Sequence, residues 1–107
     1  MKYTIDFSQK VRNQDMDIVE SLDMFTITKQ LLGMHTRGGS DLVWDILFLF
    51  KENETTKKIP LTEKEIEFLV NDVIHFNEGT YAYMKEQLKR FLLSGKEEKK
   101  KIESTTL

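Results

Sequence analysis

The first residues of the chain alternate strictly between apolar and polar side chains. Tyr3, Ile5 and Phe7 fall on one face, and the residues between them are polar. A repeat of two residues is the period of a strand with one buried face. The pattern therefore predicts a short β-strand over residues 2–7, followed by a polar connection.

A longer apolar pattern runs from residue 15 to residue 32 at mostly helical spacing. It includes Ile18, Leu22 and Phe25, and Gly33 stands where a helix can end. We therefore expect a helix over 15–32. Residues 24–28 (MFTIT) also alternate and favour strands, so the alternative is a short helix followed by a strand that pairs with residues 2–7.

The most hydrophobic run follows a polar turn. Ser40 is a good N-cap for a helix over 41–52, which is apolar nearly all round and is typical of a fold centre or an interface. Residues 53–60 read as a polar loop that ends at the proline.

Two more helices are predicted towards the C-terminus. Thr62 and Glu65 have the spacing of a capping box, which begins a helix that runs to about residue 77. Another helix can start at Thr80 and stop at Gly95. These patterns predict a mainly α, single-domain bundle of about four helices over residues 1–95, with room for a short N-terminal β element. Residues 96–107 are predicted to be a disordered, charged tail.

Composition limits the class of function. The net charge of −2 gives the protein no general attraction to nucleic acid. The absence of cysteine excludes disulfide frameworks, thiolate zinc sites and cysteine nucleophiles. The N-terminus shows no signal peptide, and no apolar run approaches the roughly 20 residues of a membrane span. We expect a soluble, cytoplasmic protein.

The turn at residues 35–41 (HTRGGSD) precedes a predicted helix, where backbone N–H groups and Arg37 could bind an anion. The segment lacks the lysine and the spacing of a phosphate-binding loop. A corner between two helices explains its glycines better, with Arg37 as an exposed contact residue if the turn has a function.

The two histidines raise the question of a metal site. Asp72 and Glu78 lie three residues either side of His75, and His35 with Asp41 could complete a Zn²⁺ site. Histidines and carboxylates at such spacing are also ordinary in an acidic protein. No cofactor is therefore predicted, and no nucleophile with a dedicated base is present, so we expect a protein that is not an enzyme.

Acidic residues cluster before the run at residues 24–28. Asp15, Asp17, Glu20 and Asp23 have no basic residue among them. Such carboxylates can meet a basic groove on a partner, whereas the alternative is that they only favour a helix dipole and solubility. Basic residues gather near Lys89 and in the tail, but glutamates interrupt them, so DNA binding is the weaker hypothesis.

The overall composition of the chain has a recognisable character. The chain is rich in lysine, glutamate and asparagine, lacks cysteine, is one short domain and contains acidic clusters. It resembles small accessory proteins of phages and mobile elements of low-GC Gram-positive bacteria, and among them anti-CRISPR inhibitors. The resemblance concerns general character and no aligned motif. It implies stoichiometric binding to a host defence nuclease, through contact with a host protein. The alternatives are a phage tail-assembly chaperone and a small helical DNA-binding regulator.

Overall fold

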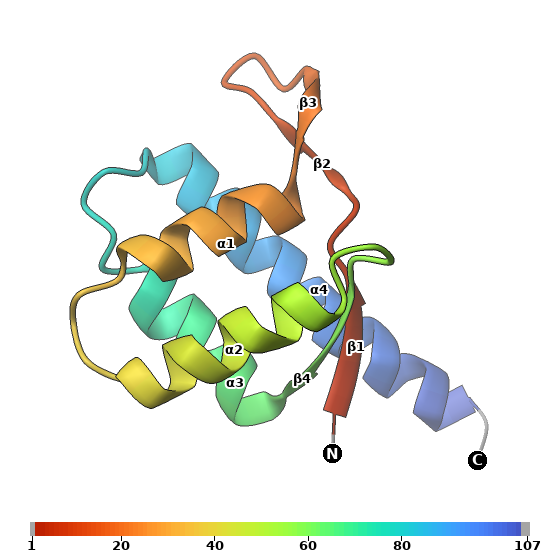
Figure 1. Ribbon diagram of the computed structural model, residues 1–107. Coiled ribbons are helices and arrows are strands. Elements are labelled where there is room, and N and C mark those ends of the chain that lie inside the picture. Colours follow the sequence, from red (N-terminus) through yellow and green to blue (C-terminus); the bar gives the residue numbers. More distant parts are fainter. Residues whose placement is uncertain (1, 106–107) are drawn as a thin grey trace.

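The computed structural model describes the backbone of residues 2–105 and the side chains of residues 2–96. Its elements in chain order are β1 (Lys2–Asp6), β2 (Lys10–Arg12), β3 (Ile18–Asp23), α1 (Met24–Met34), α2 (Ser40–Glu52), β4 (Lys58–Thr62), α3 (Glu63–Phe68), the π-helix η1 (Leu69–Ile74) and α4 (Ala82–Thr105) (Figure 1). The fold is a small α+β domain with two antiparallel sheets of two strands each. The prediction of a mainly α helical bundle is therefore wrong.

β1 pairs with β4, a strand from the middle of the chain. The N-terminal strand predicted over residues 2–7 is thus confirmed, but part of the expected polar loop at residues 53–60 forms its partner. Ile5 lies opposite Ile59, and Thr4 lies opposite Pro60. Because proline has no N–H group, it fits only where the ladder needs no donor. The proline that marked the end of a loop lies inside a strand.

β2 and β3 form a hairpin that projects from the top of the molecule in Figure 1. The helix expected over residues 15–32 is wrong in its first half, which is strand β3, and α1 begins only at Met24. The alternative is wrong as well, because residues 24–28 are helical and β3 pairs with β2. The apolar residues of β3 and of α1 together have a spacing close to that of the apolar face of a single helix, which explains the wrong prediction.

The later helices begin within about two residues of the predicted positions. The Thr62 hydroxyl accepts a hydrogen bond from the Glu65 N–H at 3.1 Å, and the Glu65 carboxylate accepts one from the Thr62 N–H at 2.8 Å, so the capping box is confirmed. Gly39, not Ser40, is the N-cap of α2, and its φ is 70°.

Gly95 does not end α4, which continues to Thr105. A Cβ atom at Gly95 would lie 3.1 Å from the Ile5 side chain, so this glycine allows the helix to pack closely on β1. The disordered tail predicted over 96–107 lies, beyond Lys96, outside the side chains that the structure describes.

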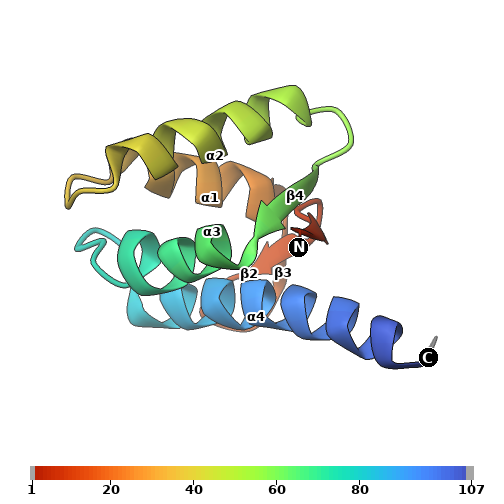
Figure 2. The ribbon, with the colours of Figure 1, turned by 90° about the horizontal axis from the view of Figure 1, so that it is seen from below.

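The strands lie between two helical layers, with α1 and α2 on one side and α3 and α4 on the other (Figure 2). Phe7 is fully buried at the centre. Its ring makes edge-on contacts with Phe50 and Phe91 at centroid distances of 5.0 and 5.1 Å, and Phe25 stacks on Phe50. Burying such rings is the main favourable contribution to folding. No helix within the described part of the chain is long and apolar enough to cross a bilayer.

Candidate functional site

The turn between β2 and β3 together with the first residues of β3, residues 13–20, is called the hairpin tip below. Its backbone is organised by Asn13, whose side-chain oxygen accepts hydrogen bonds from the N–H groups of Asp15 and Asp17 at 2.9 and 3.1 Å. The Met16 N–H donates to the Asn13 carbonyl, and the Asn13 N–H donates to the Asp17 carbonyl, both at 2.9 Å. Asparagine is suited to such turns because its side chain can bond the backbone two residues ahead. The tip is therefore an ordered turn.

Met16 adopts a left-handed backbone conformation with φ 66°. This conformation is uncommon for a residue with a Cβ atom and persists only where surrounding contacts impose it. Here the Arg12 guanidinium donates a hydrogen bond to the Met16 carbonyl at 2.7 Å. The base of the hairpin thus fixes the geometry of its tip.

The hairpin tip presents both charge and apolar surface to the solvent. The carboxylates of Asp15, Asp17 and Glu20 are exposed, and within the described residues no hydrogen bond or ion pair engages them. Beside them, Met16 is 62% exposed and Ile18 is 51% exposed. Free carboxylates next to exposed apolar side chains can attract and then dock a macromolecular partner.

Asp23, the fourth residue of the acidic cluster, lies apart from the other three. It is only 4% exposed and caps α1 by accepting hydrogen bonds from the N–H and the hydroxyl of Thr26, both at 2.8 Å. Its other carboxylate oxygen pairs with the Lys57 ammonium. Burial by itself would raise the pKa of Asp23, but the bonds from Lys57 and Thr26 outweigh it and lower that pKa. Asp23 is therefore a structural residue here.

Arg37 also lies away from the hairpin, at the corner that joins α1 to α2 (Figure 1). Its guanidinium lies over the Phe76 ring, 4.2 Å from the centroid. A Cβ atom at the neighbouring Gly39 would come within 2.5 Å of the Phe68 ring. Packing and a positive φ at both glycines account for this turn, and the structure adds nothing that points to a bound anion.

The histidine and carboxylate candidates for a metal site do not come together. His75 places Nδ1 3.3 Å from the Lys89 ammonium, whereas His35 places Nε2 3.0 Å from the Gly38 carbonyl. In the part of the chain that the structure describes, no three histidine or acidic side chains are close enough to hold a metal ion, so Asp72, Asp41 and Glu78 complete no such group.

Basic side chains of α4 are engaged with acceptors instead of forming a row for phosphates. Arg90 pairs with Glu86 at 2.8 Å, Lys85 donates to the His75 carbonyl at 2.9 Å, and Lys96 pairs with Glu63. The pairing raises the pKa of Lys96. The geometry therefore favours none of these cations for binding nucleic acid.

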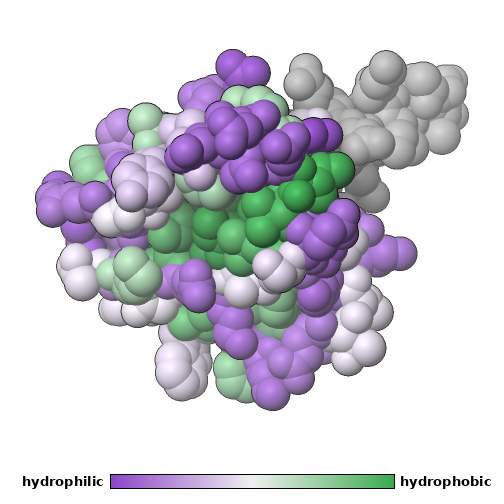
Figure 3. Space-filling view, turned by 90° about the horizontal axis from the view of Figure 1, so that it is seen from above, coloured by the Kyte–Doolittle hydropathy of each residue, from purple (hydrophilic) through white to green (hydrophobic). Residues whose placement is uncertain are grey.

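A groove of about 780 Å³ lies beside the hairpin and was not predicted from the sequence. It runs between α4, β1 and the hairpin, and both Arg12 and Met16 belong to its lining. Figure 3 looks onto this side of the molecule and shows a hydrophobic hollow between hydrophilic margins. The lining residues come from both ends of the chain, so no local sequence pattern could have revealed the groove.

The helix α2 carries a second exposed surface. Trp44 is 67% exposed and Phe48 is 54% exposed, with their ring centroids 6.4 Å apart. Only Ile46 and Phe50 of this helix are fully buried. Trp44 and Phe48 therefore lie outside the core, because one face of α2 is enough to complete it.

Comparison with known protein families, with curated proteins and with solved structures gives no match to this chain. The function must therefore be inferred from the geometry and chemistry of the surfaces described above.

Proposed function

We propose that this protein acts by binding another protein through the hairpin tip, without chemistry of its own. The supporting observation is that the carboxylates of Asp15, Asp17 and Glu20, which have no partner among the described residues, lie beside the exposed side chains of Met16 and Ile18. Charges of one sign speed the encounter with an oppositely charged partner. Apolar side chains supply the surface whose burial stabilises the complex.

The ordered backbone of the hairpin tip also supports this proposal. Bonds from Asn13 and Arg12 hold the turn in one conformation before any partner arrives. A preordered element loses less conformational entropy on binding than a flexible one.

The carboxylates indicate a partner with a basic surface. The groove of a nuclease that holds nucleic acid is such a surface, and a small acidic hairpin could occupy it in place of the phosphates. Together with the resemblance to anti-CRISPR inhibitors, this chemistry leads us to propose a stoichiometric inhibitor of a host defence nuclease.

The test uses purified CRISPR effector nucleases from Gram-positive bacteria, titrated with the full chain. Cleavage of target DNA should fall to background near one equivalent of inhibitor. The variant Asp15→Asn/Asp17→Asn/Glu20→Gln should associate with the same nuclease at least about tenfold more slowly, because steering depends on these charges. The wild-type affinity should also fall as salt concentration rises.

A matched control removes the same charge from α2 with Asp41→Asn/Asp45→Asn/Glu52→Gln, at three exposed residues. This control should associate as fast as the wild type. Equal association by the hairpin variant and the wild type at every salt concentration would contradict the proposed site. Loss of binding in the α2 control alone would place the contact on the surface around Trp44.

A further inference from the structure

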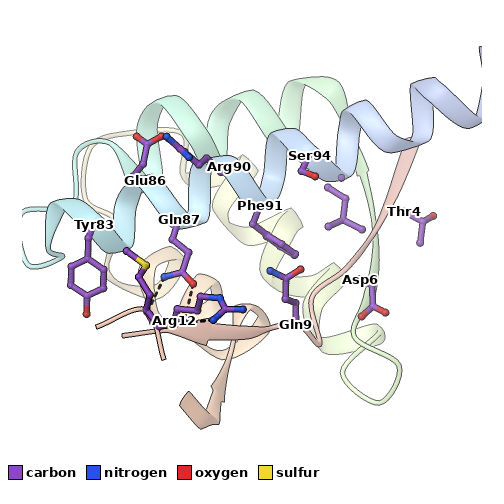
Figure 4. Close-up of a pocket in the computed structure, with 13 residues that line it drawn as sticks. Thr4, Asp6, Gln9, Arg12, Tyr83, Glu86, Gln87, Arg90, Phe91 and Ser94 are labelled. Carbon is purple, nitrogen blue, oxygen red and sulfur yellow. Dashed lines mark hydrogen bonds and ion pairs between the residues drawn. The ribbon is translucent and has the colours of Figure 1, made fainter. Parts of the chain in front are cut away.

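The groove beside the hairpin borders an edge of β1 that pairs with no strand in the described part of the chain. Its lining includes Thr4 and Asp6 of β1 and the facing side of α4. No residue of β4 belongs to this lining, so the groove lies along the edge of β1 that faces away from β4. Figure 4 shows Thr4 and Asp6 at one end of the groove and Arg12 at the other.

The strand register shows which backbone groups of β1 face the groove. Thr4 lies opposite Pro60, which has no N–H group, so this pair cannot exchange two hydrogen bonds. Paired positions alternate along an antiparallel ladder, and the Phe7 N–H does donate to the Lys57 carbonyl at 2.8 Å. The N–H and C=O groups of Thr4 and Asp6 therefore point away from β4, and within the described residues no other backbone group bonds them.

The corresponding edge of β2 is closed by a side chain. The Arg12 N–H donates to the amide oxygen of Gln87 at 2.7 Å, and the amide nitrogen of Gln87 donates to the Arg12 carbonyl at 3.0 Å (Figure 4). One glutamine thus supplies the pair of bonds that a neighbouring strand would make. Among its described side chains, α4 provides no such group for Thr4, and the helix passes β1 with Gly95 against Ile5.

We infer that this groove binds an extended peptide segment of the protein partner, which adds a strand to the free edge of β1. An unpaired edge is a template for an incoming strand, and backbone bonds provide the affinity. Pairing with the five residues of β1 occupies about 17 Å of the segment, which then continues past Asp6 along the groove to Arg12. Alternate side chains of that segment would face Phe91 on the groove wall.

The charges at the two ends define the segment further. Among the described residues, the Arg12 guanidinium has no carboxylate partner and donates its one hydrogen bond to the Met16 carbonyl. At the other end, hydrogen bonds from the Ser8 hydroxyl and N–H lower the pKa of Asp6 and keep its carboxylate charged. The segment should therefore carry an acidic residue near Arg12, a basic residue near Asp6 and apolar residues between them.

This inference rests on the proposed function, because Arg12 and Met16 connect the groove to the hairpin tip. The probe is a display library of random 12-residue peptides, selected on the full chain. Selected sequences should share the acidic–apolar–basic order. On addition of a synthetic selected peptide, the amides of Thr4 and Asp6 should become protected from hydrogen exchange in NMR spectra.

Two variants block the groove in different ways. Thr4→Pro removes the outward N–H donor, which an edge strand tolerates, and Ser94→Trp fills the space beside Phe91. Each should weaken peptide binding at least about tenfold. Thr4→Val keeps the N–H group, and Leu93→Trp changes an exposed residue of α4 outside the groove lining, so both controls should bind within about twofold of the wild type.

The peptide itself provides a test that does not depend on the folding of any variant. N-methyl groups can be placed on every second residue in two phases, which start at adjacent positions of the peptide. The phase that methylates the N–H groups facing β1 should abolish binding, and the other phase should leave it intact. Equal effects of the two phases would overturn the inference, as would selected peptides that Thr4→Pro and Ser94→Trp bind normally.

A library without binders, or a wild-type dimer that Thr4→Pro converts to monomer, would also overturn it. The Asp15→Asn/Asp17→Asn/Glu20→Gln variant should still bind the peptide, so failure of the groove and failure of the hairpin tip can be told apart.

Discussion

Acidic residues lie in the turn before β3 and at the last position of β3, in opposite situations. At the hairpin tip, Asp15 and Asp17 are exposed and their carboxylates have no partner within the described residues. At the base, Asp23 is buried, caps α1 and pairs with Lys57. A run of acidic residues in sequence is thus divided by the fold into charges that a partner can reach and a charge that holds the structure together.

The base of the hairpin is anchored by contacts across the chain, whereas the tip depends on local bonds. The Met24 N–H donates to the Gln9 carbonyl and the Phe25 N–H to the Phe7 carbonyl, at 2.8 and 2.9 Å. Lys57 reaches the buried carboxylate from the segment before β4, with a left-handed φ of 59°. Changes at the base should therefore alter folding, and changes at the tip should alter binding.

The largest effect should come from Asp23→Ala. The substitution removes the cap of α1 and leaves the partly buried Lys57 ammonium without its partner, which together should cost about 2–4 kcal/mol of unfolding free energy. Urea denaturation followed by circular dichroism measures this loss. The same change at the tip, Asp17→Ala, is the matched control and should alter stability by less than about 0.5 kcal/mol. Similar losses from both variants would contradict the division between base and tip.

The elements that were predicted correctly are those whose sequence signals lie within a few neighbouring residues. β1 was visible because Tyr3 and Ile5 alternate with polar residues, and the capping box was visible because Thr62 and Glu65 lie three residues apart. Both signals act within one strand or one helical turn. The distant parts of the chain are not needed to form them.

The remaining strands depend on pairing that no local pattern reveals. β2 has only three residues and one buried apolar side chain, Val11, and β4 contains Pro60, a residue that usually excludes a strand. Because the pairing of β2 with β3 cannot be recognised from the sequence, the apolar residues from Ile18 to Leu32 were assigned to a helical repeat. Tertiary pairing overrode that periodicity.

The candidate site was predictable only in part, for the same reason. Sequence analysis identified Asp15, Asp17 and Glu20 as a contact surface, but burial of Asp23 depends on Lys57, which is 34 residues away. The groove joins β1 to α4 across most of the chain, and its key amide, Gln87, looks like an ordinary surface residue in the sequence.

A smaller effect should appear in the acid dependence of stability. The pKa of Asp23 in the folded protein lies below its ordinary value of 3.8. Its stabilising contribution is therefore complete above about pH 4 and is lost as the pH falls through the lowered value in the folded state. The difference in unfolding free energy between the wild type and Asp23→Asn should stay constant above about pH 4 and shrink as the pH falls from there to pH 2. A difference that stays constant, or grows, over this range would show that the Asp23 charge does not stabilise the fold.

The smallest effect on stability should come from neutralising the hairpin tip. The variant Asp15→Asn/Asp17→Asn/Glu20→Gln should change the unfolding free energy by less than about 0.5 kcal/mol, because these side chains are exposed and make no ion pair within the described residues. Any change should be towards higher stability, since removing like charges relieves their repulsion, and it should disappear in 1 M salt. Thermal denaturation at low and high salt measures both quantities. A loss above 1 kcal/mol would mean that the tip carboxylates support the turn, and they would then no longer be free to act only on a partner.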